Sequence, residues 1–137
     1  MYLVAFFAFL FAAAIGLTMA VRHARGLDSG RPLGIAHGLF AVSGLVLLAV
    51  GLASVQAELG WWILVSFLVA AAGGSYLFVR QAKGEPWPGF VIAAHGGLAI
   101  ATVVVLGLWL ADRPPPRSAG GDVPAVTTDN PSSLPAE

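Results

Sequence analysis

Residues 33–54 read LGIAHGLFAVSGLVLLAVGLAS, an apolar stretch whose one ionisable side chain is His37. The hydrocarbon core of a bilayer, about 30 Å thick, is crossed by about 20 helical residues, so this stretch predicts a transmembrane helix. Three more apolar blocks of similar length lie at residues 2–21, 61–79 and 89–111. Backbone polar groups in lipid must be satisfied internally, which favours helices for all four blocks. We therefore predict an all-α membrane protein, a four-transmembrane-helix bundle over residues 1–111.

The composition of the whole chain supports this class and excludes several others. The 137 residues are 58% hydrophobic and 10% charged, and the formal net charge is zero. Such a balance is too apolar for a soluble domain of this size and gives no electrostatic reason to bind nucleic acid. The chain has no cysteine, which excludes disulfides, thiolate metal sites and covalently attached haem. Residues 112–137 are polar and proline-rich, which predicts a disordered tail.

The two halves of the apolar region resemble each other at an offset of 58 residues. Residues 3–53 align with 61–111 without a gap, and 18 of the 51 pairs are identical. The triplet Ala-His-Gly at 36–38 recurs at 94–96, and Gly16 falls on Gly74. Each half is one helical hairpin that enters from the same side. The alignment therefore predicts a parallel internal repeat of two hairpins, related by a pseudo-twofold axis along the membrane normal.

Basic residues predict the orientation in the membrane. Five of them flank the first and third connections between helices, and the second connection has none; the five are Arg22, Arg25, Arg31, Arg80 and Lys83. The positive-inside rule then places the first and third connections in the cytoplasm and both termini outside. Arg113 and Arg117, just after the fourth block, oppose this orientation. No basic residue precedes Arg22, so we expect the first block to be a retained helix and not a signal peptide.

His37 and His95 are the residues that point to a function. An ionisable side chain within a membrane is costly and marks a functional site, and these two lie at equal depth in the second and fourth predicted helices. Gly16 and Gly74 fall in the same layer. Two imidazoles alone are too few ligands for a bare metal ion, since zinc sites use three or four. One b-type haem with both histidines as axial ligands is therefore the sharper hypothesis.

Further residues have places in this hypothesis. The glycines would leave room for a flat macrocycle. Basic side chains one to two turns nearer the water would pair with the haem propionates, namely Arg22, Arg25, Arg80 and Lys83. His23 falls at the end of the first helix, opposite Gln81 in the repeat, and we expect it to be solvated. One buried haem is then the most that the three histidines could hold.

With these features the chain resembles the small four-helix cytochrome b modules of bacterial membranes, the cytochrome b561-like bundles and the haem-carrying anchor subunits of respiratory complexes. The resemblance covers residues 2–111 and rests on the helix count, on His37 and His95, and on the flanking glycines. It implies haem b, a bacterial cytoplasmic membrane, and electron transfer with a quinone or a redox partner subunit. Cytochrome b561 proteins proper carry two haems on four histidines, a set that this chain lacks.

Two other functions are compatible with the same sequence. In the first, the histidines only pack, and the protein is a non-redox accessory or scaffold subunit of a larger membrane complex. In the second, the pseudo-twofold axis is the path of a small transporter and the histidines form a proton-linked site. None of the three hypotheses gives the chain a reaction on a substrate of its own, so it is expected to be a carrier or a subunit more than an enzyme.

Overall fold

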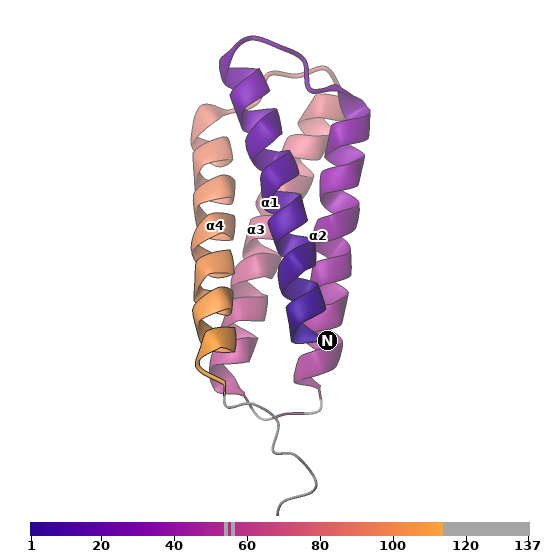
Figure 1. Cartoon of the computed structure of the whole chain (residues 1–137). Coiled ribbons are helices and arrows are strands. Elements are labelled where there is room, and N and C mark those ends of the chain that lie inside the picture. The colour runs from indigo at the N-terminus through magenta and orange to yellow at the C-terminus, as the bar shows by residue number, and fades with distance from the viewer. Residues whose placement is uncertain (54, 56, 114–137) are drawn as a thin grey trace, which may run out of the picture.

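The computed structural model describes residues 1–53, 55 and 57–113, and they form an antiparallel bundle of four helices (Figure 1). The helices are α1 (Tyr2–Ala24), α2 (Gly30–Leu52), α3 (Glu58–Ala82) and α4 (Gly89–Ala111). Position 54, the expected end of the second block, lies outside the described residues. So does the predicted tail from residue 114 onward. The connections 25–29 and 83–88 share one end of the bundle, here called the loop-side end.

Each of the four helices is long and apolar enough to cross a membrane. Only 17–28% of the most apolar part of each helix is buried inside the bundle, so most of its apolar side chains face outward. An exterior of this kind is stable in an apolar surrounding, which suggests a lipid bilayer. The helices α1 and α3 each run three residues beyond the predicted blocks, ending at residues 24 and 82.

The same capping arrangement ends both of these helices at the loop-side end. Gly26 and Gly84 have φ angles of +68° and +70°, a left-handed conformation that glycine adopts without a Cβ penalty. The following amide, at residue 27 or 85, donates back to the carbonyl of Arg22 or Arg80 at 2.9 Å. This is the Schellman closure. Helical geometry therefore continues past the apolar block until a glycine allows the chain to turn.

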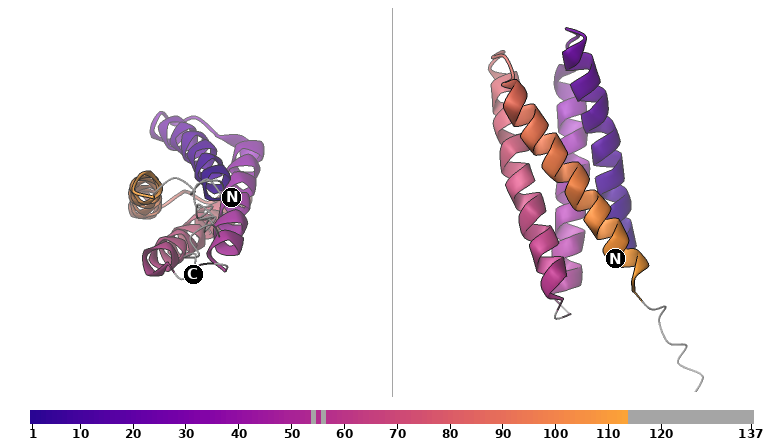
Figure 2. Two further views of the ribbon diagram at one scale, coloured as in Figure 1. Left: turned by 60° about the horizontal axis from the view of Figure 1, so that its bottom comes forward. Right: turned by 90° about the vertical axis from the view of Figure 1, so that its left-hand side faces the viewer.

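The helices pack in a square in which α1 and α3 each lie beside α2 and α4, with the closest packing inside each hairpin. In Figure 2, α4 crosses the bundle at an angle, and its C-terminal end meets α1. There the rings of Tyr2 and Trp109 stand edge to face with centroids 5.4 Å apart. The pairs α1–α3 and α2–α4 are diagonal and meet through side chains.

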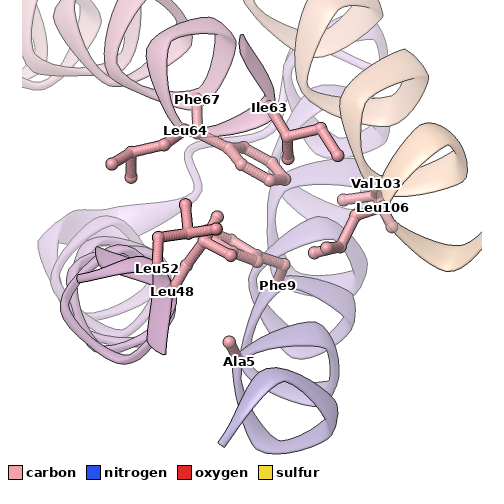
Figure 3. Packing of buried hydrophobic residues seen from close by; sticks show 9 residues of the cluster. All are labelled: Ala5, Phe9, Leu48, Leu52, Ile63, Leu64, Phe67, Val103 and Leu106. Carbon is pink, nitrogen blue, oxygen red and sulfur yellow. The ribbon is translucent and has the colours of Figure 1, made fainter. Parts of the chain in front are cut away.

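The hydrophobic core occupies the half of the bundle away from the loop-side end. Figure 3 shows its nine buried residues, which are Ala5, Phe9, Leu48, Leu52, Ile63, Leu64, Phe67, Val103 and Leu106. At its centre the rings of Phe9 and Phe67 stack across the diagonal, with centroids 3.8 Å apart and an interplanar angle of 9°. In the loop-side half, by contrast, α1 has no buried residue after Ala12 and α4 has none before Thr102.

Candidate functional site

His37 and His95, here called the histidine pair, make matching contacts within their hairpins. The Nδ1 atom of His37 on α2 lies 2.8 Å from the carbonyl oxygen of Ala12 on α1. The Nδ1 atom of His95 on α4 lies 2.8 Å from the carbonyl oxygen of Ala70 on α3. In each case a ring N–H is the only possible donor, so both imidazoles donate from Nδ1. Each histidine therefore ties the two helices of its own hairpin together.

Gly16 and Gly74 lie directly against the two imidazoles. A Cβ added at Gly16 would come within 3.0 Å of Cε1 of His37, and one at Gly74 within 2.8 Å of Cε1 of His95. Each glycine is four residues after the alanine whose carbonyl the ring reaches, one helical turn along the same face. The absent side chain is what lets the imidazole approach the neighbouring helix. In this structure the space over the glycines thus holds imidazole rings.

The histidine pair also meets across the bundle. The two rings come from diagonal helices, and their centroids are 6.0 Å apart with an interplanar angle of 75°. Both side chains are half-buried. Within the described part of the chain, each ring makes its one hydrogen bond through Nδ1. In the neutral form, each Nε2 atom then carries a lone pair that accepts no hydrogen bond from the described residues.

Two imidazoles are the full extent of this ligand set. Among the described residues, no group of three or more His, Cys, Asp or Glu side chains could hold a metal ion. Sites for a bare zinc ion use three or four protein ligands, more than the two imidazoles supply. Two imidazoles could instead complete the coordination of a metal ion whose other ligands belong to a cofactor.

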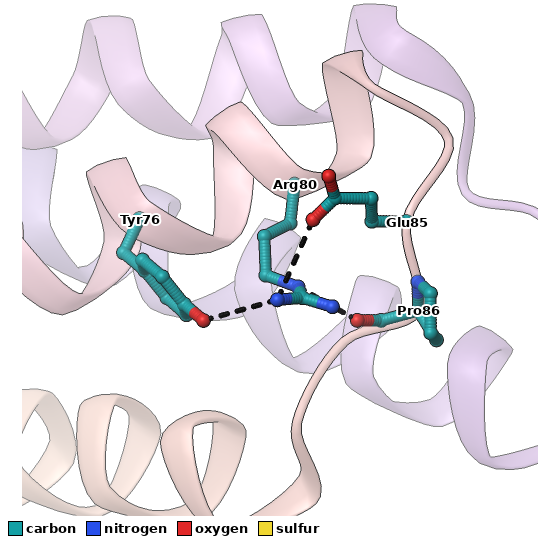
Figure 4. A network of polar contacts seen from close by, with 4 residues as sticks. All are labelled: Tyr76, Arg80, Glu85 and Pro86. Carbon is teal, nitrogen blue, oxygen red and sulfur yellow. Dashed lines mark hydrogen bonds and ion pairs between the residues drawn. The ribbon is translucent and has the colours of Figure 1, made fainter.

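Of the four basic residues predicted for the site, Arg22 and Arg80 bond to the loops and Arg25 and Lys83 are exposed. The guanidinium of Arg22 donates to the carbonyl oxygen of Asp28 at 2.6 and 3.1 Å. Arg80 does the same to Pro86 at 2.9 Å, and its guanidinium also contacts Tyr76 and Glu85 at 3.2 and 3.4 Å (Figure 4). The other two, Arg25 and Lys83, are the exposed C-caps of α1 and α3.

A cavity of about 320 Å³ opens at the loop-side end, between the two connections that Arg22 and Arg80 close. Its lining consists of His23, Leu27, Asp28, Ser29, Gln81, Gly84, Glu85, Pro86 and Trp87. His23 is exposed, and its ring lies 5.0 Å from that of Trp87. The sequence analysis did not find this cavity, because its two walls are distant in the chain and no motif marks either one.

The Phe9–Phe67 stack was also missed, although a signal for it was present. The two residues are an identical pair at the same offset of 58 that relates the histidines. The offset therefore marks two pairs that meet across the bundle, one on each diagonal. No protein-family model, curated protein or solved structure matches the chain, so the site is interpreted from its own geometry.

Proposed function

We propose that the protein is an integral membrane b-type haem protein, in which His37 and His95 are the axial ligands of one haem. Its function would be electron transfer with a quinone or a redox partner subunit. The observation that carries the proposal is the histidine pair itself. Both Nδ1 atoms are held by backbone carbonyls at 2.8 Å, and the two rings, on diagonal helices, meet edge to face.

This arrangement suits axial ligands in two respects. A histidine that binds metal through one nitrogen usually donates the other N–H to a carbonyl or carboxylate, which orients the ring. The two rings also lie close to each other, with centroids 6.0 Å apart, so both could contribute to one site. A haem bound by two histidines supplies one-electron chemistry and no open position for oxygen.

Packing in the loop-side half supports a bound group there. The nine residues of the core cluster lie in the opposite half, and no described residue of α1 after Ala12 or of α4 before Thr102 is buried. Pockets for cofactors in helical bundles are lined by side chains of facing helices. The histidine pair therefore lies outside the main core cluster.

We also infer that the fold consists of two tandem hairpins related by a pseudo-twofold axis along the membrane normal. Paired contacts at the offset of 58 support this inference. They include the histidine bonds to Ala12 and Ala70, the glycine caps at 26 and 84, and the arginine bonds to loop carbonyls. Equivalent contacts at equivalent positions are what a duplicated hairpin would retain.

The proposed setting is a bacterial cytoplasmic membrane, with the loop-side end in the cytoplasm and both termini outside. The cluster of basic residues at that end supports this orientation. Arg113, which opposes it, has its guanidinium 3.7 Å from the Trp109 ring centroid and 4.2 Å from that of Tyr2. Such cation–π contacts stabilise a cation beside aromatic rings. They give a structural explanation for Arg113 at the outer end that does not depend on the orientation in the membrane.

The absorption spectrum of the purified full-length protein tests the proposal. We expect a Soret band, sharp α and β bands on reduction, and one haem per chain by pyridine haemochromogen assay. Replacing either member of the histidine pair with alanine should remove these bands, whereas His23→Ala should keep them. Circular dichroism of each variant shows whether it remains helical. A colourless, iron-free protein from haem-replete cells would overturn the proposal.

One observation favours a second function, that of a non-redox accessory subunit. Each histidine already ties its own hairpin together through a carbonyl bond, and the two rings contact each other directly. A histidine pair with only a structural role needs no contact beyond these. In that case the protein would be colourless and would co-purify with a partner, and His37→Ala would leave that assembly unchanged.

A further inference from the structure

The loop-side end carries more positive charge than the loop-closing bonds use. Segments 22–31 and 80–88 contain five basic and two acidic residues. The guanidinium groups of Arg22 and Arg80 bond to loop carbonyls. The other three basic side chains are exposed, and they are Arg25, Arg31 and Lys83. Because these three stand at the ends of apolar helices, a surrounding bilayer would have its headgroups at their level.

Arg31 reaches from the start of α2 to the end of α3. Its Nη2 atom donates to the carbonyl oxygen of Ala82 at 3.2 Å, which places the guanidinium beside the backbone of Lys83, the next residue. A second bond, from Nε2 of Gln81 to the carbonyl of Gly30 at 3.2 Å, joins the same two helices. The two bonds fix the end of α3 against the start of α2. Arg31 and Lys83, here called the basic edge, therefore lie on a well-defined part of the bundle.

The basic edge has no carboxylate partner in the described part of the chain. Of the two carboxylates at this end, Glu85 pairs with Arg80 at 3.4 Å (Figure 4), and Asp28 accepts from the amide of Gly30 at 2.9 Å. The bond to α3 uses one of the five N–H donors of Arg31, and an arginine fork matches the oxygens of a phosphate. Two cations on one edge repel each other, and an anion bound by both removes that repulsion.

Apolar side chains continue from the basic edge toward the middle of the bundle. Ile35 lies one helical turn from Arg31, and Val79 lies one turn from Lys83, each on the same helix face as its basic residue. Both are exposed, at 51% and 49%. A ligand whose anionic group contacts the two cations would lay its apolar part over these side chains. An anionic group joined to apolar chains is the chemistry of a phospholipid.

The edge between α1 and α4 lacks one of the two cations. At the offset of 58, Lys83 corresponds to Arg25, whereas Arg31 corresponds to Gly89. The α1–α4 edge therefore has one exposed cation at the level where the basic edge has two. The chain thus contains its own comparison between a single and a paired cation.

We propose that the basic edge binds the phosphate of an anionic phospholipid, with Arg31 and Lys83 as its two cationic contacts. One basic residue near a membrane surface strengthens attraction to anionic lipid about fivefold. Two such residues give a preference over zwitterionic lipid of about 25-fold, and the α1–α4 edge keeps only the fivefold preference of Arg25. The site concerns the lipid around the bundle and does not require haem.

A pair of labelled variants tests this inference, because the chain has no cysteine and a single introduced one can carry a fluorophore. Val79→Cys reports on the basic edge. Val21→Cys, its counterpart at the offset of 58, reports on the α1–α4 edge, and both valines are exposed. The full-length protein is reconstituted in phosphatidylcholine vesicles with increasing fractions of brominated phosphatidylglycerol or brominated phosphatidylcholine, which quench a nearby fluorophore. We expect phosphatidylglycerol to be preferred about 25-fold at position 79 and about fivefold at position 21.

Removal of single charges then identifies the contacts. Arg31→Gln and Lys83→Gln should each lower the preference at position 79 about fivefold, whereas Arg25→Gln should lower it only at position 21. Equal preferences at the two labels would overturn the proposal, because the basic residues would then act only through the general surface charge. That comparison keeps all the basic residues, so it decides the question even if a glutamine variant does not fold. The haem content of the same protein is measured separately, so either proposal can fail without the other.

Discussion

Replacing Gly74 with alanine should weaken the bundle through its contact with a single imidazole. The new Cβ would lie 2.8 Å from Cε1 of His95 and 3.4 Å from both ring nitrogens, while the ring is held by its bond to the Ala70 carbonyl. Overpacking of this kind costs about 1–3 kcal/mol, and loss of an interhelical hydrogen bond in a membrane adds about 0.6 kcal/mol. Alanine regains about 0.5–1 kcal/mol through helix propensity. We therefore expect a net loss of about 2 kcal/mol.

The neighbouring glycine gives a matched control. A Cβ at Gly73 would lie 3.4 Å from Cβ of His95, an ordinary contact, so Gly73→Ala should be neutral or slightly stabilising. Unfolding of the detergent-solubilised protein by added SDS, followed by circular dichroism, measures both variants. In a His95→Ala background the cost of Gly74→Ala should disappear. Equal stability of the two glycine variants, or a cost that persists without the imidazole, would refute the reasoning.

Two further predictions concern the core and a helix cap. A double-mutant cycle of Phe9→Leu and Phe67→Leu, measured by the same SDS unfolding, should give a coupling energy of about 0.5–1.5 kcal/mol, because the stacked rings are 3.8 Å apart; additive effects would contradict a direct contact. Gly84→Ala should cost about 1–2 kcal/mol, because the φ angle there is +70°. As a control, Gly89 has no positive φ angle and an added Cβ there would meet no atom of a neighbouring element within 4 Å, so Gly89→Ala should leave the free energy of unfolding unchanged. Equal effects of the two substitutions would argue against backbone strain at the cap.

The four helices were predictable because hydropathy alone demands them. The ends of the helices were less predictable. Both α1 and α3 continue to residues 24 and 82, where backbone capping ends them, whereas the predicted blocks ended where the apolar residues stop. Gly26 and Gly84 were visible in the sequence. The residue at which each helix ends was not, because it depends on backbone φ angles and capping hydrogen bonds that form only in the folded chain. This explains why α1 and α3 extend three residues beyond the C-terminal ends of their predicted blocks.

The candidate site was predictable in its residues more than in its contacts. The sequence alignment at the offset of 58 predicted that His37 and His95 lie at equal depth, and their rings are 6.0 Å apart in the structure. Their bonds to Ala12 and Ala70 could not be foreseen, because any residue offers a carbonyl and only the helix packing selects which one is reached. The cavity at the loop-side end depends in the same way on two loops that meet only in the folded chain.

The placement of the core has a consequence for how the protein matures. All nine core residues lie in the half of the bundle opposite the histidine pair, so the hairpins are joined by contacts that no cofactor supplies. If the histidine pair holds a haem as proposed, we expect the chain to insert and assemble before the haem binds, with both imidazoles already held by carbonyls of the neighbouring helices. Haem binding would then be a later, separate step. Loss of the haem would leave a folded protein that can bind haem again.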